Sequence, residues 1–208
     1  MTGLITTDAD VAQGAAWLAV AEPRFAGALR LTGPLPLRLD PDGFAALFNK
    51  IVSQQVSVAS ARAIWGRVVA AGLLDAGAVR HATDEDLKAV GLSRPKMKYA
   101  RALAQADIDY AALRHATDAQ VIQTLTAVSG IGVWTAQVYA MFNLGRADVF
   151  APGDLALQEA VRMLFDLEAR PTAKQLEHRA QAWSPWRAVA ARLLFTYYRI
   201  AKDRDGLT

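Results

Sequence analysis

A Gly-x-Gly turn between two apolar segments is the feature that most constrains the fold of this chain. The turn, Gly130-Ile131-Gly132, lies within residues 125–136, and apolar residues that favour helices flank it on both sides. Glycine has no Cβ, so Gly130 and Gly132 can take positive φ and let the backbone of a ligand approach their amides. A helix that starts after the turn directs its positive N-terminal end outward. The segment predicts a helical hairpin whose turn faces a phosphate; the alternative is a C-cap glycine in a tight corner between two helices.

Helical periodicity runs through most of the chain, with little of the alternation that strands show. Each predicted helix begins next to a side chain that accepts hydrogen bonds from the amides of a first helical turn. These starts follow Asp8, Asp42, Thr83, Asp118, Asp154 and Thr172. Residues 33–41 resist helix, because their prolines restrict themselves and the residues before them. The pattern predicts an all-α fold with one extended connector.

A short internal repeat accompanies the hairpin. Residues 81–84 (His-Ala-Thr-Asp) recur at 115–118, and the Leu-x-Ala-Val of 87–90 recurs at 125–128. Each copy is predicted to form a helix, a glycine-containing turn and a second helix. The first copy places four cations around its turn, and these predict phosphate contacts, with a solvated helix face as the alternative. The four are Arg94, Lys96, Lys98 and Arg101.

Composition narrows the class of protein. With 208 residues, 53% of them hydrophobic, the chain can bury a substantial core. Its net charge of +3 favours polyanions only mildly. The absence of cysteine excludes disulfides, thiolate nucleophiles, cysteine-bound zinc and an iron–sulfur cluster held by cysteines. No secretory signal is evident, and no apolar run approaches the roughly 20 residues of a membrane span.

Two further segments follow the hairpin in a diagnostic order. They are Val149-Phe150-Ala151-Pro152-Gly153-Asp154 and Pro185-Trp186-Arg187. Together with the hairpin they resemble the helix-hairpin-helix DNA glycosylases, in particular the 3-methyladenine DNA glycosylase II (AlkA-type) branch. The resemblance covers about residues 44–201. It includes the segment 53–57 (Ser-Gln-Gln-Val-Ser), which is similar to the part of the family that reaches into DNA.

The resemblance implies an all-α, two-lobed helical bundle with a helix-hairpin-helix motif and a cleft between the lobes. We expect one glycosylase domain over residues 1–208, with the hairpin at about 118–144. Residues 1–43 are expected to form peripheral helices and the extended connector. Larger members carry an additional N-terminal mixed α/β domain, for which the first 40 residues leave too little chain.

Asp154 occupies the position of the family's catalytic aspartate, whereas Asp148 matches a position that catalysis does not require. The alternative for Asp154 is a helix N-cap, and the two roles can coexist. Breaking an N-glycosidic bond builds positive charge on the deoxyribose, which a nearby carboxylate stabilises. A purine alkylated at N3 or N7 is already cationic and leaves readily, so one acid suffices. Whether Asp154 stabilises the oxocarbenium-like sugar or activates water stays open.

Trp134 stands where relatives that also cleave the strand carry a lysine. The resemblance therefore implies a monofunctional enzyme that uses water and leaves an abasic site. Trp134 and Trp186 match positions that line the base pocket, where indoles stack on a flipped cationic base; core packing is the alternative. Val138 lies where some members have an aromatic ring, which predicts a wider pocket with broad tolerance for alkylated purines.

The resemblance also implies the groups that hold DNA. The turn residues 130–132 are expected to grip the strand, with Gln54 and Gln55 beside them and Arg94, Lys96 and Lys98 as phosphate contacts. Gln55 occupies the wedge position, which is apolar in some members, and ordinary helix-turn residues are the alternative for both glutamines. The main-chain carbonyls of three hairpin residues are expected to hold a structural Na⁺ or K⁺, with no cofactor for catalysis and no iron–sulfur cluster. The three are Thr126, Val128 and Ile131.

These features predict a base-excision repair glycosylase that hydrolyses the N-glycosidic bond of 3-methyladenine and 7-methylguanine. Its expected partner is double-stranded DNA containing alkylated bases, and we expect a soluble monomer with no membrane association. The expected location is the cytoplasm, at the nucleoid in a bacterium, or the nucleus in a eukaryote. The alternatives are a noncatalytic helix-hairpin-helix DNA-binding protein and a glycosylase for mismatched or oxidised bases.

Overall fold

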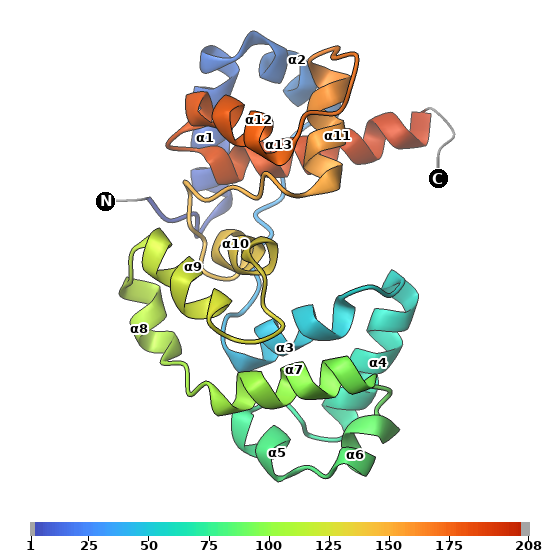
Figure 1. Cartoon of the computed structure of the whole chain (residues 1–208). Coiled ribbons are helices and arrows are strands. Elements are labelled where there is room, and N and C mark those ends of the chain that lie inside the picture. Colours follow the sequence, from blue (N-terminus) through green and yellow to red (C-terminus); the bar gives the residue numbers. More distant parts are fainter. Residues whose placement is uncertain (1–2, 205–208) are drawn as a thin grey trace. The chain divides into compact units, whose positions relative to one another are not determined.

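The chain folds into helices throughout the part that the structure describes. In this computed structural model, residues 3–204 are described, and the only strand-like feature among them is an isolated bridge between Leu4 and Arg146. The all-α prediction is therefore confirmed. The helices divide into two compact units (Figure 1). Among the described residues, the terminal unit combines 3–39 with 140–204, and the central unit is Asp40–Tyr139.

The terminal unit joins the first two helices of the chain to the last ones. A cluster of aromatic rings lies in its core: Phe25 is 5.1 Å from Trp183 and 6.0 Å from Phe165, measured between ring centroids. Residues before 40 are thus part of this core. The elements are α1 (Asp8–Ala21), α2 (Pro23–Thr32), α11 (Leu155–Leu164), α12 (Ala173–Ala180), the 3₁₀ helix η1 (Gln181–Trp183) and α13 (Arg187–Arg204).

The predicted connector, residues 33–41, forms no helix, as its prolines require, and a buried arginine bonds its main chain. Arg192, 1% exposed, donates from Nε to the Leu37 carbonyl (2.8 Å) and from Nη1 to the Ala188 carbonyl (2.9 Å). Burial, with a smaller contribution from Arg38, lowers the pKa of Arg192 to about 10. Main-chain carbonyls, and not a carboxylate, accept the hydrogen bonds of this buried guanidinium.

The central unit is built around α7, which packs on α3, α5 and α6 (Figure 1). Its core consists of apolar side chains such as Phe48, Ile51 and Leu87, each with no exposed surface. The helix α10 begins in this unit and ends beyond its last residue, Tyr139. The elements are α3 (Phe44–Ser53), α4 (Val58–Ala70), α5 (Ala76–His81), α6 (Asp84–Ala89), α7 (Arg94–Gln105), α8 (Tyr110–His115), α9 (Asp118–Thr126) and α10 (Val133–Phe142).

The internal repeat corresponds to two helical hairpins, α6–α7 and α9–α10. Thr83 and Thr117 start α6 and α9 through the same capping box, in which the threonine and a side chain three residues later bond each other's amides. The turns contain Gly91 (φ 96°) and Gly130 (φ 93°), which adopt the left-handed conformation that favours glycine.

Candidate functional site

One cavity of the central unit collects most of the residues predicted to hold DNA. It has a volume of about 590 Å³. Three segments far apart in the sequence line it: the end of α3 with the loop after it, the start of α7, and the α9–α10 turn. The predicted residues among its lining are Gln54, Gln55, Lys96, Thr126, Val128, Gly130, Ile131 and Gly132. Arg94 and Lys98 lie on the first turns of α7, exposed and outside the lining.

The two glycines of the hairpin adopt different conformations. Gly130 has the positive φ expected of the turn, and Ile131 closes the turn by donating its N–H to the Val128 carbonyl (3.0 Å). Gly132, in contrast, has no positive φ, and no atom lies within 4 Å of the place where its Cβ would be. The missing Cβ of Gly132 therefore leaves open space at the turn.

Interactions inside the central unit occupy two of the predicted DNA-binding side chains. The Gln54 amide donates from Nε2 to the Gly130 carbonyl (2.9 Å). The Lys96 ammonium, on a residue only 9% exposed, donates to the Val52 carbonyl at 2.6 Å. Burial lowers the pKa of this ammonium. The cation thus lies at the C-terminus of α3, where the helix dipole and unpaired carbonyls favour it.

The basic residues of the first hairpin separate into two kinds. Lys96 and Arg101 bond main-chain carbonyls, Arg101 reaching those of Val79 (2.9 Å) and Ala82 (2.8 Å). Arg94 and Lys98 are exposed, and the structure gives them no ion pair within the described residues. These last two cations are the ones that can meet a phosphate.

Gln55 adopts a left-handed conformation (φ 56°) that is uncommon for residues other than glycine, asparagine and aspartate. It is exposed, and it follows the last residue of α3 by two positions. Such strain, which costs on the order of 1 kcal/mol or more, persists where the surroundings enforce it, often at functional sites. The loop thus presents the side chain at the predicted wedge position to solvent.

Trp134 begins α10 beside the hairpin turn and is 45% exposed. This is more exposed surface than a tryptophan packed in a core retains. Val138, one helical turn later, is half-buried in the same helix. The exposure of Trp134 argues against the alternative that it is a plain core residue.

Asp154 is the N-cap of α11 in the terminal unit. Its Oδ1 accepts hydrogen bonds from the N–H groups of Ala156 (2.9 Å) and Leu157 (3.1 Å). The side chain is half-buried. The capping role inferred from the sequence is present, and it fixes the carboxylate at the positive end of a helix.

Asp148, the competing carboxylate, is held in a bidentate ion pair. Arg187 donates to both of its oxygens (2.7 and 3.0 Å), and the Ser184 hydroxyl donates a further hydrogen bond (2.8 Å). This network ties the segment before Asp154 to the segment Pro185-Trp186-Arg187 within the terminal unit. Asp148 therefore has a structural role.

Trp186 packs on the first helix of the chain. A Cβ at Gly14 of α1 would lie 2.7 Å from Cε3 of Trp186, so the helix can approach the indole only because residue 14 is glycine. Trp186 is half-buried. The indole therefore supports the packing of α1.

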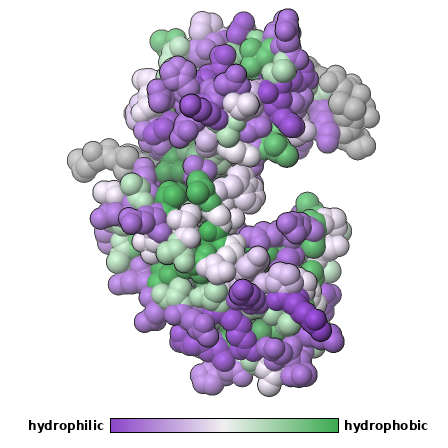
Figure 2. Space-filling model, viewed as in Figure 1, coloured by the Kyte–Doolittle hydropathy of each residue, from purple (hydrophilic) through white to green (hydrophobic). Residues whose placement is uncertain are grey.

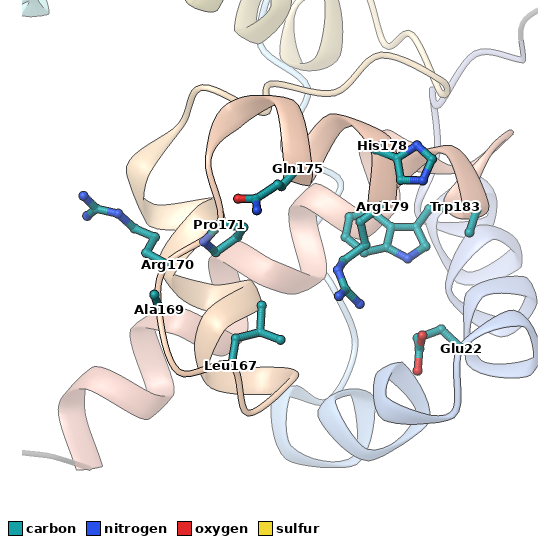
Figure 3. Close-up of a pocket in the computed structure, with 10 residues that line it drawn as sticks. Glu22, Leu167, Ala169, Arg170, Pro171, Gln175, His178, Arg179 and Trp183 are labelled. Carbon is teal, nitrogen blue, oxygen red and sulfur yellow. The ribbon is translucent and has the colours of Figure 1, made fainter.

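A second cavity, of about 710 Å³, lies in the terminal unit (Figure 3). Leu167, Pro171 and Trp183 give it an apolar wall, while Arg179 and Glu22 bring charges of opposite sign. None of the predicted site residues lines it. The surface of this unit over α12 is mostly hydrophilic (Figure 2). Because no residue predicted to act on DNA lines it, this cavity is not the candidate site.

Among residues 3–204, no group of three or more histidine, cysteine, aspartate or glutamate side chains could hold a metal ion. At the hairpin, the ligands expected for a cation are main-chain carbonyls. In the same part of the chain, none of the helices has the length and apolar character needed to traverse a bilayer.

Sequence reasoning missed Tyr99. Its ring lies against Gly130, where a Cβ would overlap it, so Tyr99 supports the hairpin from α7. The spacing of Lys96 and Tyr99 places both on one face of that helix, a signal that the sequence contains. Their partners lie 30 or more residues away along the chain, and periodicity does not identify those.

Comparison with known proteins gives the family. A model of the HhH-GPD superfamily of base excision DNA repair proteins matches residues 48–185. The crystal structure of a DNA-3-methyladenine glycosidase from Bacillus halodurans is 31% identical, with a TM-score of 0.79, over 90% of this chain and 88% of its own. A 3-methyladenine DNA glycosylase of Schizosaccharomyces pombe, solved with abasic DNA, shares the fold: TM-score 0.77, 24% identity, 88% of this chain and 95% of that one.

A curated relative, the putative DNA-3-methyladenine glycosylase YfjP of Bacillus subtilis, is 27% identical over 173 residues, which are 77% of this chain and 60% of YfjP. The chain spans 34 to 60% of the length of three curated relatives. The family match covers both the hairpin and Asp154. The chain belongs to the HhH-GPD superfamily of base excision DNA repair proteins, in its 3-methyladenine glycosylase (AlkA-type) branch.

Proposed function

We propose that this protein is a base-excision repair DNA glycosylase that releases alkylated purines such as 3-methyladenine and 7-methylguanine from double-stranded DNA. The observation that carries the proposal is the similarity to the Bacillus halodurans DNA-3-methyladenine glycosidase, which extends over nearly the full length of both chains. The hairpin cavity and the capped Asp154 supply the groups that such a reaction needs. The protein acts as a monomer, since one chain contains all of them.

Asp154 is the catalytic residue of this proposal. Two amides of α11 hold its carboxylate in one orientation, so no reorganisation is needed when positive charge develops on the deoxyribose. A cationic alkylated base leaves without a proton from a second acid. The same carboxylate stabilises the sugar or orients the attacking water, and both steps use one position of its oxygens.

Water is the nucleophile, and the enzyme is monofunctional. The residue two positions after Gly132 is Trp134, so no lysine stands there to form a Schiff base. The buried Lys96 is engaged by the Val52 carbonyl and has a fixed structural partner. The product is an abasic site and a free base.

Trp134 of the central unit and Trp186 of the terminal unit are each proposed as an indole on which a flipped base stacks, and such stacking favours a cationic purine. Gln55 fills the gap that the base leaves in the duplex and hydrogen-bonds the widowed partner base. Arg94 and Lys98 neutralise phosphates of the bound strand.

A monovalent cation, Na⁺ or K⁺, is proposed at the hairpin. Thr126, Val128 and Ile131 all line the 590 Å³ cavity, and their main-chain carbonyls are the oxygen donors that such a hard cation prefers. The Val128 carbonyl accepts one hydrogen bond, from Ile131, and a carbonyl oxygen has two lone pairs. The cation would place positive charge beside a DNA phosphate.

Chromatography of free bases released from methylated DNA tests the proposal. The parent protein is expected to release 3-methyladenine and 7-methylguanine. Asp154→Asn keeps a good helix cap but removes the charge, so stability and duplex affinity should persist while the release rate falls about 100-fold or more. Asp154→Ala should lose about 1 kcal/mol of stability in addition.

Other outcomes point to the alternatives. If the parent binds duplex DNA and releases no methylated base, the protein is a noncatalytic DNA-binding protein. Release only from mismatched or oxidised substrates would assign it to a different lesion class. Activity on one small lesion without release of 7-methylguanine would contradict the wide pocket.

A further inference from the structure

The loop between α3 and α4 is attached to the hairpin by one side chain. Gln54 is the C-cap of α3, and its side-chain amide reaches across 76 residues of sequence to the Gly130 carbonyl (2.9 Å). The next residue, Gln55, is held at a positive φ, and α4 starts three residues later. The position of the Gln55 side chain therefore depends on the attachment made by Gln54.

Helix α7 also holds the C-terminal end of α3, where this loop begins. The Lys96 ammonium bonds the Val52 carbonyl in the last turn of α3, and the Tyr99 ring, one turn further along α7, lies against Gly130. The same helix thus contacts both the origin of the loop and the hairpin turn. Gln54 closes this arrangement by joining the loop directly to the turn.

The Gln54 amide can donate this hydrogen bond only while the loop and the hairpin turn keep the arrangement that the structure shows. The Gly130 carbonyl belongs to the turn whose amides face the strand, so a hairpin set in place by a bound strand also sets Gln54. Because Gln55 follows Gln54 directly, its direction is set at the same time. Binding of the DNA backbone by the hairpin and insertion of the Gln55 side chain then occur together.

We propose that Gln54 is a positioning residue that couples the grip of the hairpin on the strand to the insertion of Gln55 into the duplex. The proposal rests on the proposed function, in which Gln55 fills the gap left by a flipped base. Gln54 is then not one of the DNA contacts that the sequence predicts. It acts on DNA indirectly, by positioning Gln55.

A double-mutant cycle in the full chain tests the coupling. The duplex carries 2-aminopurine beside a tetrahydrofuran abasic analogue, and its fluorescence rises when the neighbouring stack is opened. Gln54→Met keeps the side-chain length but removes the donor, so the equilibrium for opening should fall about two- to tenfold, the usual value of one hydrogen bond. In a Gln55→Ala background the same change should have no further effect. Gln54→Glu, which places an acceptor against the Gly130 carbonyl, should lower the equilibrium more than Gln54→Met.

Gln123→Met, at an exposed glutamine of α9, is the matched control and should leave the fluorescence unchanged. Thermal unfolding of each variant separates loss of coupling from loss of fold. Independent, multiplicative effects of the Gln54 and Gln55 changes would overturn the proposal, as would a parent protein that does not open the reporter. The reporter needs no excision, so a parent that opens the stack but releases no base would refute the proposed function alone.

Discussion

The ring of Tyr99 occupies the place where a side chain at Gly130 would begin. Two features of the protein therefore require glycine at position 130: this contact and its φ of 93°. Gly132 is required by neither, since its φ is ordinary for any residue and its Cβ position is empty. Packing within the protein therefore does not account for glycine at position 132, whereas the proposed approach of a DNA backbone would.

Exchanging each glycine for alanine separates these two requirements. Gly132→Ala should leave the free energy of unfolding within about 0.5 kcal/mol of the parent, because it meets no atom of the protein. Its duplex affinity should fall about tenfold, since the methyl group lies in the path of the strand. Gly130→Ala should lose about 2 kcal/mol or more of stability from overlap and backbone strain. Urea unfolding and a binding titration measure both, and parent-like affinity of Gly132→Ala would place the strand elsewhere.

Three of the six predicted helix starts are correct, because capping is local. Thr83, Asp154 and Thr172 cap their helices at the predicted positions. The start assigned to Asp42 is wrong, since the N-cap of α3 is Gly43 and no side chain caps that helix. The starts assigned to Asp8 and Asp118 are one residue late, because the threonine before each aspartate forms a capping box and is the true N-cap. A threonine followed three residues later by an acid or amide was the signal that would have corrected them.

Which basic side chains bond the protein and which are exposed could not be predicted, because this depends on contacts between residues distant in sequence. Lys96 and Lys98 look alike in the chain, yet one is buried on the Val52 carbonyl, 44 residues away, and the other is exposed. Likewise, nothing local indicates that residues 3–39 and the C-terminal helices share the core around Phe25 and Trp183. Tertiary packing decides these points.

Replacing Lys96 and replacing Lys98 should have different effects on the salt dependence of DNA binding. Lys98→Met is expected to reduce the slope of log K against log salt by about 1, as one lost phosphate contact does. Lys96→Met should leave that slope unchanged but lower the thermal midpoint, because a C-terminal carbonyl of α3 loses its partner. A reduced slope for Lys96→Met would show that its ammonium leaves Val52 to meet DNA.

The central unit should lose stability in alkali through two tyrosines, the buried Tyr139 and the half-buried Tyr110. Burial, and then Asp42, raises the pKa of Tyr110 to about 12 and that of Tyr139 in the same direction. A raised pKa means that the neutral phenol stabilises the fold fully below pH 10, the unfolded value, and that this stabilisation disappears as the pH rises towards 12.

Tyr110→Phe isolates one of these contributions. Its free energy of unfolding should fall less between pH 9 and pH 11 than that of the parent. The difference should be on the order of 1 kcal/mol, reduced by solvent screening because Tyr110 is only partly buried. Comparing urea unfolding of the two proteins cancels the titration of lysines and of Arg192. Equal losses in both would show that Tyr110 ionises as it does in the unfolded chain.

Gly14 provides a test of how the position of Trp186 is set. Alanine in a helix interior is ordinarily more stable than glycine by about 1 kcal/mol. At position 14 its Cβ would lie 2.7 Å from both Trp186 and Val189, so Gly14→Ala should instead destabilise the protein by about 1–3 kcal/mol. Gly66→Ala, in α4 with nothing within 4 Å, is the matched control and should stabilise the protein.

The same pair of variants reports on the base pocket. If Trp186 lines it, the displaced indole in Gly14→Ala should slow the release of 3-methyladenine more than it weakens binding to undamaged duplex, while Gly66→Ala changes neither. Single-turnover release and a binding titration, both below the unfolding temperature, measure the two effects. Unchanged release from a destabilised Gly14→Ala protein would assign Trp186 to the core of the terminal unit alone, because a moved ring that lined the pocket could not leave the reaction unaffected.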